Sequence, residues 1–481
     1  MPSRRSLATT GAAIAALVAT TLVGGAGDPA RSAEPTSPIS LWAPKNVTTY
    51  QYRGRIWADD LGLRVIAGNE SFEVHTSRPS YDDPVQAIWK SAGGDVVLPT
   101  DPKSTIGALG SFLSFEIRRE GSDTVRRVKR KACLGGWAER RDPAANATSP
   151  YPRSCFYNLY AIGGLQGVQA GWASRLTGIG MMHVDAGRYQ VTARITQPYA
   201  DALGLSAEDR TRTFTLDVQG YDDGGVVGHH RAARTVASPN SAPTSARAGV
   251  IGDYLPDLRS VPAWGIAIAR KGRSLRFAAT VWNDGNSPLV VDGFRRADED
   301  EMDAYQYFFD GAGNQTGYQL VGEMHWDAKP SHQHWHFRDF AKYTLVDANK
   351  VQLVRSKKEA FCLANTDAVD LSNPAADWTP ENTDLATACG DLTSLSIREV
   401  LAAGWGDTYS QTRAGQAFDI SELPNGTYYI AVIANPKHRL VESDTTNNVA
   451  YRKIVLKGRG VNRTVTAEQV GMIVEPKIRY Y

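Results

Sequence analysis

The sequence predicts an all-β protein with two β-sandwich domains. Short runs rich in β-branched and aromatic residues, such as LSFEI at 113–117 and RYQVTARI at 188–195, recur between clusters of Gly, Pro, Asp and Asn. The chain has 481 residues, whereas a single hydrophobic core stops growing at roughly 250 to 300 residues. We therefore expect two cores, both formed mainly by strands.

A change in composition marks the boundary between the two domains. Residues 223–248 are rich in Gly, Ser, Ala and Pro and offer few side chains for a core, which is typical of a linker. The linker would join an N-terminal sandwich at 34–222 to a second domain at 249–458, which is followed by a C-terminal tail at 459–481.

The second domain is also predicted to be mostly β. The runs at 276–282, 343–348 and 427–434 favour strands. Helical periodicity is confined to patches such as LTSLSIREVLAAG at 392–404.

The two halves of the chain contain similar segments. Residues 125–134 resemble 353–363, and residues 186–199 resemble 425–438. Duplication of one sandwich would explain both similarities, with the first copy lacking the histidine cluster described below. The alternative is that a Gly-x-Tyr segment before an alternating strand recurs in many sandwiches.

Residues 1–33 have the features of a secretory signal. Arg4 and Arg5 precede an apolar stretch at 7–23 and then small residues suited to peptidase cleavage. The paired arginines resemble a bacterial twin-arginine signal, although they also occur in ordinary export signals. No other stretch approaches the roughly 18 apolar residues of a membrane span, so we expect an exported protein without one.

Charge and cysteine content agree with export. Removal of residues 1–33, which carry a net charge of +2, leaves the chain formally near neutral, and this balance does not indicate nucleic-acid binding. In an oxidising compartment the four cysteines would form two disulfides. Pairing of Cys133 with Cys155 and of Cys362 with Cys389 gives compact local loops.

The sequence HQHWH places His332, His334 and His336 at alternate positions. On a strand all three would project from one face, with the outer α-carbons about 13 Å apart. A histidine holds a metal ion roughly 6 to 6.5 Å from its α-carbon, so one shared ion is just within reach, and more easily if the strand is bulged. Nitrogen ligands favour copper, nickel or zinc over calcium or magnesium. The alternative is a strand whose histidines only face solvent or a neighbouring tyrosine.

From His332 onward, the sequence HQHWHFRDFAKYTLVDANKVQLVRSKKEAFCL resembles the copper-binding segment of the lysyl oxidase family. The resemblance continues through GDTYSQTRAGQAFDISELPNGTYYIAVIANP and LVESDTTNNV in the family's order, and it covers roughly 249–458. It implies a β-sandwich catalytic domain in which the three histidines bind Cu(II). Most of the family's other disulfide cysteines are missing from this chain.

The resemblance also implies a lysine tyrosylquinone cofactor. Lys358 in KEAFCL stands where the family's cofactor lysine falls, and Tyr409 in GDTY stands where its cofactor tyrosine falls. Such a quinone supplies an electron sink, with which O2 oxidises a primary amine to an aldehyde, releasing ammonia and hydrogen peroxide. The motifs do not identify the base that removes the substrate proton; Asp339 and Asp407 are candidates.

A calcium site is a further implication. The segment VESDTTNNV carries four oxygen-bearing side chains within seven residues, a density that suits calcium. Matching residues in some family members bind calcium together with an aspartate that resembles Asp257. The alternative is a turn in which Asp and Asn side chains cap backbone groups. The four residues of the segment are Glu442, Asp444, Asn447 and Asn448.

The leading hypothesis is a secreted, copper-dependent amine oxidase that acts on peptidyl lysine or small primary amines. The main alternative is a non-catalytic secreted sandwich protein that binds copper and calcium, and a third is a metal-dependent dioxygenase or hydrolase of another β fold. A covalent link between Lys358 and Tyr409 distinguishes the first from the second. Peroxide release from amines distinguishes it from the third. The sequence identifies neither the natural amine nor the role of the N-terminal domain.

Overall fold

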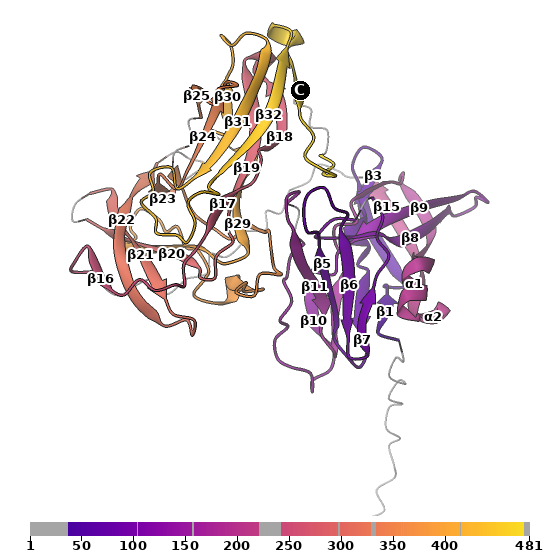
Figure 1. Ribbon diagram of the computed structural model, residues 1–481. Coiled ribbons are helices and arrows are strands. Elements are labelled where there is room, and N and C mark those ends of the chain that lie inside the picture. The colour runs from indigo at the N-terminus through magenta and orange to yellow at the C-terminus, as the bar shows by residue number, and fades with distance from the viewer. Residues whose placement is uncertain are drawn as a thin grey trace, which may run out of the picture. The chain divides into compact units, whose positions relative to one another are not determined.

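The computed structural model confirms an almost entirely β protein (Figure 1). The predicted signal, most of the predicted linker and His332 lie outside the described residues. None of the helices in the described part of the chain has the length and apolar character that a membrane span requires. The structure describes residues 37–102, 104–155, 158–220, 242–296, 299–328, 333–356, 358, 360–413 and 415–475.

The N-terminal half forms four sheets around one hydrophobic core that includes Phe72, Phe112 and Phe115. Three short helices are η1 (Ala58–Leu61), α1 (Gln197–Leu203) and α2 (Ala207–Arg210). The largest sheet has the order β2 (Asn46–Gln51), β15 (Thr211–Gly220), β14 (Gly187–Ile195), β8 (Leu109–Arg119) and β9 (Val125–Ala132). The other sheets are β1 (Ile39–Trp42), β4 (Arg64–Ala67), β12 (Trp172–Arg175) and β10 (Ala138–Arg140); β11 (Gly163–Val168), β5 (Phe72–Ser77), β6 (Gln86–Ser91) and β7 (Gly94–Val97); and β13 (Met181–His183) with β3 (Arg55–Trp57).

The C-terminal half forms three sheets around a second core, in which Phe277 stacks on Phe418 and meets Tyr343 edge-on. The first sheet contains β26 (Ala360–Phe361), β23 (His334–Arg338), β22 (Gln315–Asp327), β21 (Glu301–Phe309), β20 (Leu289–Arg295) and β28 (Ser396–Leu401), with β16 (Arg247–Gly249) beside β22. The second contains β17 (Leu258–Ser260), β19 (Ser274–Asn283), β29 (Trp405–Tyr409) and β27 (Asp367–Ala368), with β18 (Trp264–Ala269) and β30 (Ala417–Asp419) beside β19. The third is β25 (Gln352–Arg355), β24 (Ala341–Val346), β31 (Gly426–Ala434), β32 (Val449–Lys457) and β33 (Thr464–Ala467). Single 3₁₀ turns are η2 (Arg270–Gly272), η3 (Pro380–Asn382) and η4 (Gly460–Asn462).

The strands predicted at 113–117, 188–195, 276–282 and 427–434 are confirmed, because each lies within a strand of the structure. The run at 343–348 is a strand up to Val346.

Residues 392–404 do not form the helix that their periodicity predicts. Strand β28 runs through this segment and pairs with β20. From Glu399 to Leu401 three consecutive residues are buried, because both faces of the strand are covered there. A strand covered on both faces loses its alternation, and its apolar run then resembles a helical pattern.

The two Gly-x-Tyr segments have the same local structure. The hydroxyl of Tyr189 donates to the carbonyl of Asp185 at 2.9 Å, and that of Tyr428 donates to the carbonyl of Pro424 at 2.8 Å. Each tyrosine thus closes a turn four residues upstream, as in the tyrosine corner of many sandwiches. The shared local geometry accounts for this similarity between the halves without requiring duplication.

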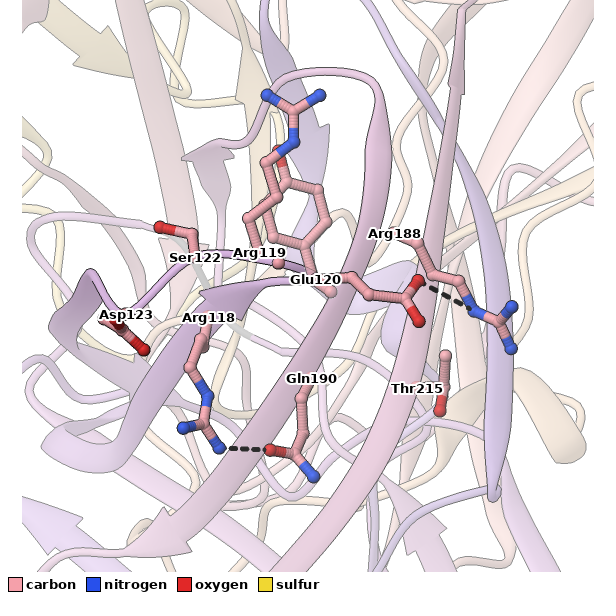
Figure 2. A pocket seen from close by; sticks show the side chains of 10 residues that line it. Arg118, Arg119, Glu120, Ser122, Asp123, Arg188, Gln190 and Thr215 are labelled. Atoms are coloured by element: carbon pink, nitrogen blue, oxygen red, sulfur yellow. Dashed lines mark hydrogen bonds and ion pairs between the residues drawn. The ribbon is translucent and has the colours of Figure 1, made fainter.

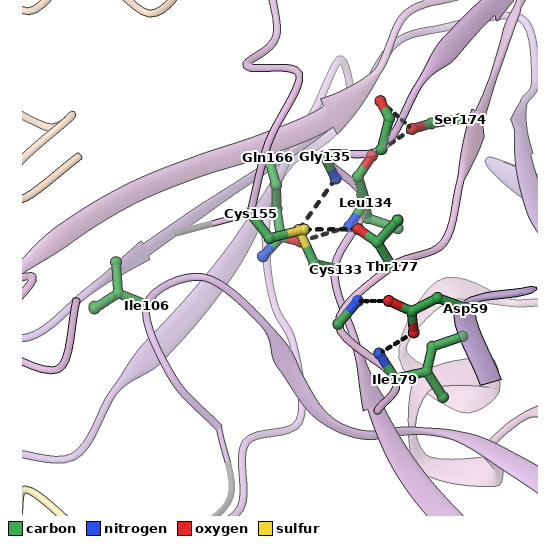
Figure 3. The surroundings of a disulfide bond; sticks show 12 residues. Asp59, Ile106, Cys133, Leu134, Gly135, Cys155, Gln166, Ser174, Thr177 and Ile179 are labelled. Carbon is green, nitrogen blue, oxygen red and sulfur yellow. Dashed lines mark hydrogen bonds between the residues drawn. A yellow bond between two sulfur atoms is a disulfide. The ribbon is translucent and has the colours of Figure 1, made fainter. Parts of the chain in front are cut away.

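Both predicted disulfides are present. Cys133 and Cys155 have α-carbons 6.1 Å apart, and the bond lies among buried side chains of the N-terminal half (Figure 3). Cys362 and Cys389 have α-carbons 5.9 Å apart. The second disulfide joins the end of β26 to the segment that precedes β28.

Candidate functional site

Strand β23 carries the part of the histidine trio that the structure describes. The Trp335 side chain is fully buried in the core, so His334 and His336 project from the opposite face of the strand. The backbone N–H of Trp335 donates to the carbonyl of Cys389 at 2.9 Å. The apolar residue of the motif therefore anchors the strand, and the disulfide-linked segment holds it in place.

The two described histidines converge on each other. Nε2 of His334 lies 2.9 Å from Nε2 of His336. Two nitrogens that each lie about 2.0 Å from one metal ion at a right angle are about 2.8 Å apart, so this pair has the separation of adjacent ligands. Burial, followed by the nearby Lys358, holds the pKa of His336 far below its usual value. The neutral imidazole is the form that binds metal.

The backbone changes conformation immediately before this pair. Gln333 has a φ of 40°, a left-handed conformation that a regular strand does not contain, and β23 begins only at His334. The strand therefore does not extend back to Gln333 in a regular extended conformation.

Strand β22 contributes two residues that the histidine motif does not reveal. His325 pairs opposite His336, and Asp327 pairs opposite His334, so all four share one face of the sheet. Oδ2 of Asp327 lies 3.7 Å from Nδ1 of His336. A carboxylate near the ring nitrogen that does not bind metal orients such a ligand. The HxD spacing in a strand that leads to the trio is the signal that would have identified both residues.

Lys358 lies beside Tyr409. It is 7% exposed, and its Nζ is 4.4 Å from the centroid of the Tyr409 ring and 5.2 Å from that of Phe361. Gly415, with a φ of 85°, packs against it so closely that a Cβ there would meet the backbone nitrogen of Lys358 at 3.2 Å. The structure therefore brings together the lysine and the tyrosine that the sequence predicts as a pair.

Tyr409 ends β29 and is held on two sides. Its ring meets Phe361 edge-on, with centroids 5.0 Å apart, and its hydroxyl donates to the carbonyl of Cys362 at 3.2 Å. Burial raises the pKa of Tyr409 well above its usual value, and the nearby Asp407 adds to the effect. The phenol is therefore protonated at neutral pH.

Asp407 is the base candidate that lies at this pair. It precedes Tyr409 by two residues on β29, so both side chains lie on the same face of the strand. Burial raises the pKa of Asp407 well above its usual value, while Lys358 opposes this shift and Asp367 adds to it. Asp339, in contrast, forms ion pairs with surface cations and is not part of this site. Its partners are Lys437 at 3.0 Å and Arg439 at 3.7 Å.

Glu399 is a further buried carboxyl group near the site. The sequence does not single it out, because it lies in the apolar run at 392–404 whose pattern resembles a helix. Its Oε2 accepts from the backbone N–H of Leu363 at 3.0 Å, whereas Oε1 has no hydrogen-bond partner among the described residues. Burial raises the pKa of Glu399 well above its usual value. The sulfurs of Cys362 and Cys389 lie within 4.8 Å of this group, but the disulfide prevents them from acting as metal ligands.

The predicted calcium residues also lie together. Nδ2 of Asn447 donates to both carboxylate oxygens of Asp257, at 2.9 and 3.0 Å, and more distantly to Asp444 at 3.3 Å. Nδ2 of Asn448 donates to Oε1 of Glu442 at 2.8 Å. The cluster joins the start of β17 to the turn before β32.

Two properties of this cluster suit a cation. The Oδ1 atoms of Asn447 and Asn448 are buried without a hydrogen-bond partner among the described residues, and rotation of either amide by half a turn would direct that oxygen toward the carboxylates. Burial raises the pKa of Asp257 and of Glu442. Oxygen ligands from carboxylates and amides are those that calcium prefers.

The fold and these residues define an all-β domain with clustered histidines beside a buried lysine–tyrosine pair. Residues 308–466 match the lysyl oxidase family. The chain is 33% identical over 141 residues to lysyl oxidase homolog 1 of Homo sapiens, covering 29% of this chain and 22% of that protein. The chain is 32% identical over 126 residues to protein-lysine 6-oxidase of Homo sapiens, a match that covers 26% of this chain and 26% of that protein. It is 30% identical over 135 residues to protein-lysine 6-oxidase of Sus scrofa, a match that covers 28% of this chain and 48% of that protein. The chain thus spans about a quarter of the length of these human relatives.

Replacement of Glu399 by Gln tests the cost of burying this carboxyl. A raised folded-state pKa means that the folded protein binds more protons than the unfolded one above pH 4.5, so Glu399 lowers stability as the pH rises through this range. Glutamine keeps the acceptor for Leu363 and does not ionise. In urea denaturation we expect E399Q to be about 1–3 kcal/mol more stable than the parent at pH 8 and similar to it at pH 4.

The exposed Glu422 provides the matched control, and E422Q should show no difference that depends on pH. A stability difference for E399Q that stays constant from pH 4 to pH 8 would contradict the assignment.

Proposed function

We propose that this chain is a secreted, copper-dependent amine oxidase with a lysine tyrosylquinone formed by Lys358 and Tyr409. The observation that carries the proposal is the position of the Lys358 Nζ, 4.4 Å from the centroid of the Tyr409 ring. Lys358 also interacts electrostatically with His336, whose pKa it lowers after the larger effect of burial. The family match over residues 308–466 supports the same conclusion.

The donor set fits copper. His334 and His336 offer imidazole nitrogens 2.9 Å apart, the spacing of two ligands at a right angle, and right-angle ligand sets are typical of Cu(II) rather than of tetrahedral zinc. Asp327 would orient the ring of His336 through Nδ1. His332 completes the proposed set from the sequence.

The buried pair suits formation of the cofactor. Lys358 is 7% exposed, and its addition to the ring would require the neutral amine, because only that form is a nucleophile. Phe361 and the carbonyl of Cys362 fix the ring of Tyr409 beside the amine, so that little motion is needed for a bond between them. The quinone, when formed, supplies the electron sink for amine oxidation.

Asp407 is proposed as the base that takes the α-proton of the substrate. It is 3% exposed and lies on the same face of β29 as Tyr409, and its raised pKa brings it closer to the pH at which a base is most effective. Asp339 is a poorer candidate because its carboxylate is held by Lys437 and Arg439.

The substrate class is a primary amine, either peptidyl lysine or a small amine. One amine, one O2 and one water would give one aldehyde, one ammonia and one hydrogen peroxide, which balances atoms and electrons. Proteins named protein-lysine 6-oxidase are among the relatives of this chain. Residues 1–33 would be removed on export, and the mature chain would comprise the sandwich at 34–222, the linker at 223–248, the catalytic domain at 249–458 and the tail at 459–481. The N-terminal mass of the exported protein tests the cleavage.

A structural calcium ion is proposed between Asp257 and the turn before β32. The two buried amide oxygens without partners support it. An ion held by Asp257, Glu442 and the two asparagines would fix the start of β17 against this turn, and through β17 the neighbouring strand β19.

A covalent link between Lys358 and Tyr409 is the decisive prediction. Copper-loaded, aerated protein should release, on tryptic digestion, a joined peptide that contains both residues. Y409F should lose this peptide and reduce amine-dependent peroxide release to background, while it retains the metal. D407N should keep the joined peptide and lose about 10²- to 10⁴-fold in turnover, because it lacks only the base. Peptide mass spectrometry and a peroxide assay measure these results.

The neighbouring lysine gives a matched control, since K357R should keep both the peptide and the activity. Absence of the joined peptide from the copper-loaded parent would contradict the proposal and favour a non-catalytic protein that binds copper and calcium.

The two ion sites serve as controls for each other. Loss of an outer-shell partner alone costs about 10- to 100-fold in metal affinity, so H334A and H336A should each lose at least this much for copper while they retain calcium. D257N should lose calcium and retain copper. Elemental analysis by mass spectrometry after equilibrium dialysis measures both metals. The exposed His438 gives the control variant H438A, and unchanged copper content in H334A and H336A would contradict the histidine site.

A further inference from the structure

The outer face of the five-stranded sheet β2–β15–β14–β8–β9 carries a concentration of positive charge. On β8, the buried Phe115 and Ile117 alternate with Ser114, Glu116 and Arg118, so one face of the sheet packs on the core and the other does not. The outer face is the one that carries Ser114, Glu116 and Arg118. No residue of the five strands that lies on this face in register with these three is buried. The cations of this face are Arg118, Arg127, Lys129, Lys131, Arg188 and Arg194, against three carboxylates: Glu116, Asp217 and Glu120, which follows the end of β8 and lies 3.8 Å from Arg188.

This imbalance is local. The whole chain has 53 basic and 51 acidic residues, so six cations against three carboxylates on one face is not a consequence of composition. A patch of one sign raises the local concentration of a ligand of the opposite sign.

The carboxylates do not neutralise the face. Glu116 lies between two arginines, with Oε1 2.9 Å from Nε of Arg127 and Oε2 3.0 Å from Nη1 of Arg194. Glu116 does not pair with Arg118, whose guanidinium instead donates a hydrogen bond of 2.6 Å to the neutral amide oxygen of Gln190 (Figure 2). Within the described residues Arg118 has no carboxylate partner, and the same holds for two lysines of β9, Lys129 and Lys131.

The cations are spread along the strands rather than gathered at a single site. Alternate residues on a strand are about 6.6 Å apart and adjacent strands about 4.8 Å apart, so the cations of β9 repeat along one line and Arg118 lies on the neighbouring strand. Figure 2 shows Arg118, Arg188, Gln190 and Thr215 around the hollow at the β8–β9 turn.

Hydroxyl groups continue the face beyond the cations. Thr192 and Thr213 face each other across β14 and β15 with oxygens 3.0 Å apart. Guanidinium forks, ammonium groups and hydroxyls are the side chains that proteins use to hold phosphate oxygens.

We propose that this outer face binds a linear polymer that carries phosphate groups in series and no nucleobases. The repeated cations match a repeated anion, and the hydroxyls match phosphate oxygens. Tyr50 is the single aromatic side chain of the face, so it lacks the stacking platform with which proteins hold single-stranded nucleic acid. A flat face also lacks a helix or ribbon to enter a duplex groove. The proposal is independent of the amine oxidase chemistry, because all of its residues belong to the N-terminal half.

Binding of the exported protein to long-chain inorganic polyphosphate tests the proposal. We expect saturable binding at 150 mM NaCl that weakens as the salt concentration rises, because counterions are released on contact. K129E/K131E should weaken the affinity by at least about tenfold and lower the slope of log K against log salt by about 1 to 2. These side chains are exposed, so the thermal unfolding midpoint should not change.

K457E/R459E is the matched control, since it changes the net charge equally at exposed positions of the C-terminal half; it should bind like the parent. Equal weakening in both double variants would overturn the proposal, as would no binding of the parent at 150 mM NaCl. Tighter binding to single- or double-stranded DNA of matched length would overturn it in favour of a nucleic-acid surface.

Discussion

The candidate site depends on the burial of one amine. Lys358 is 7% exposed, and a buried ammonium group costs several kcal/mol unless a carboxylate or a hydrogen bond compensates it. Asp407 is near enough to interact with it electrostatically, and the ring of Tyr409 lies beside its Nζ. The same low dielectric raises the pKa of Asp407 and of Tyr409. Burial therefore favours the protonated form of both Asp407 and Tyr409.

Strands distant in sequence hold this amine in place. The histidines belong to β23, Tyr409 to β29, and Phe361 to β26, which pairs with β23. The disulfide from Cys362 to Cys389 connects these parts. The carbonyl of Cys362 accepts a hydrogen bond from the Tyr409 hydroxyl, and the carbonyl of Cys389 accepts one from the backbone N–H of Trp335. One covalent bond therefore positions both the strand of the histidines and the phenol.

The sequence predicts the fold better than the details of the site. Alternation identifies strands with one solvated face, such as β8 and β14, but it fails at β28, where both faces are covered and Glu399 is hidden in an apolar run. Lys358 and Tyr409 are predicted as a pair from their positions in motifs that resemble those of the lysyl oxidase family. Their spacing in the sequence alone gives no reason to expect that they lie close together. Asp339 and Asp407 are equivalent candidates in sequence. Only the tertiary structure shows that the first lies with surface cations and the second at the buried lysine.

The two β-rich halves share one local turn but place their charged side chains differently. Both contain a tyrosine that closes a turn before a central strand, so the scaffold is similar at this level. In the C-terminal half Lys358 and Asp407 lie inside, where their desolvation lowers stability and where electrostatic interactions are strong. In the N-terminal half Arg118 and the lysines of β9 lie outside, where charge costs little and salt weakens it. Buried charge suits chemistry on a small group, whereas exposed charge suits the binding of a long ligand.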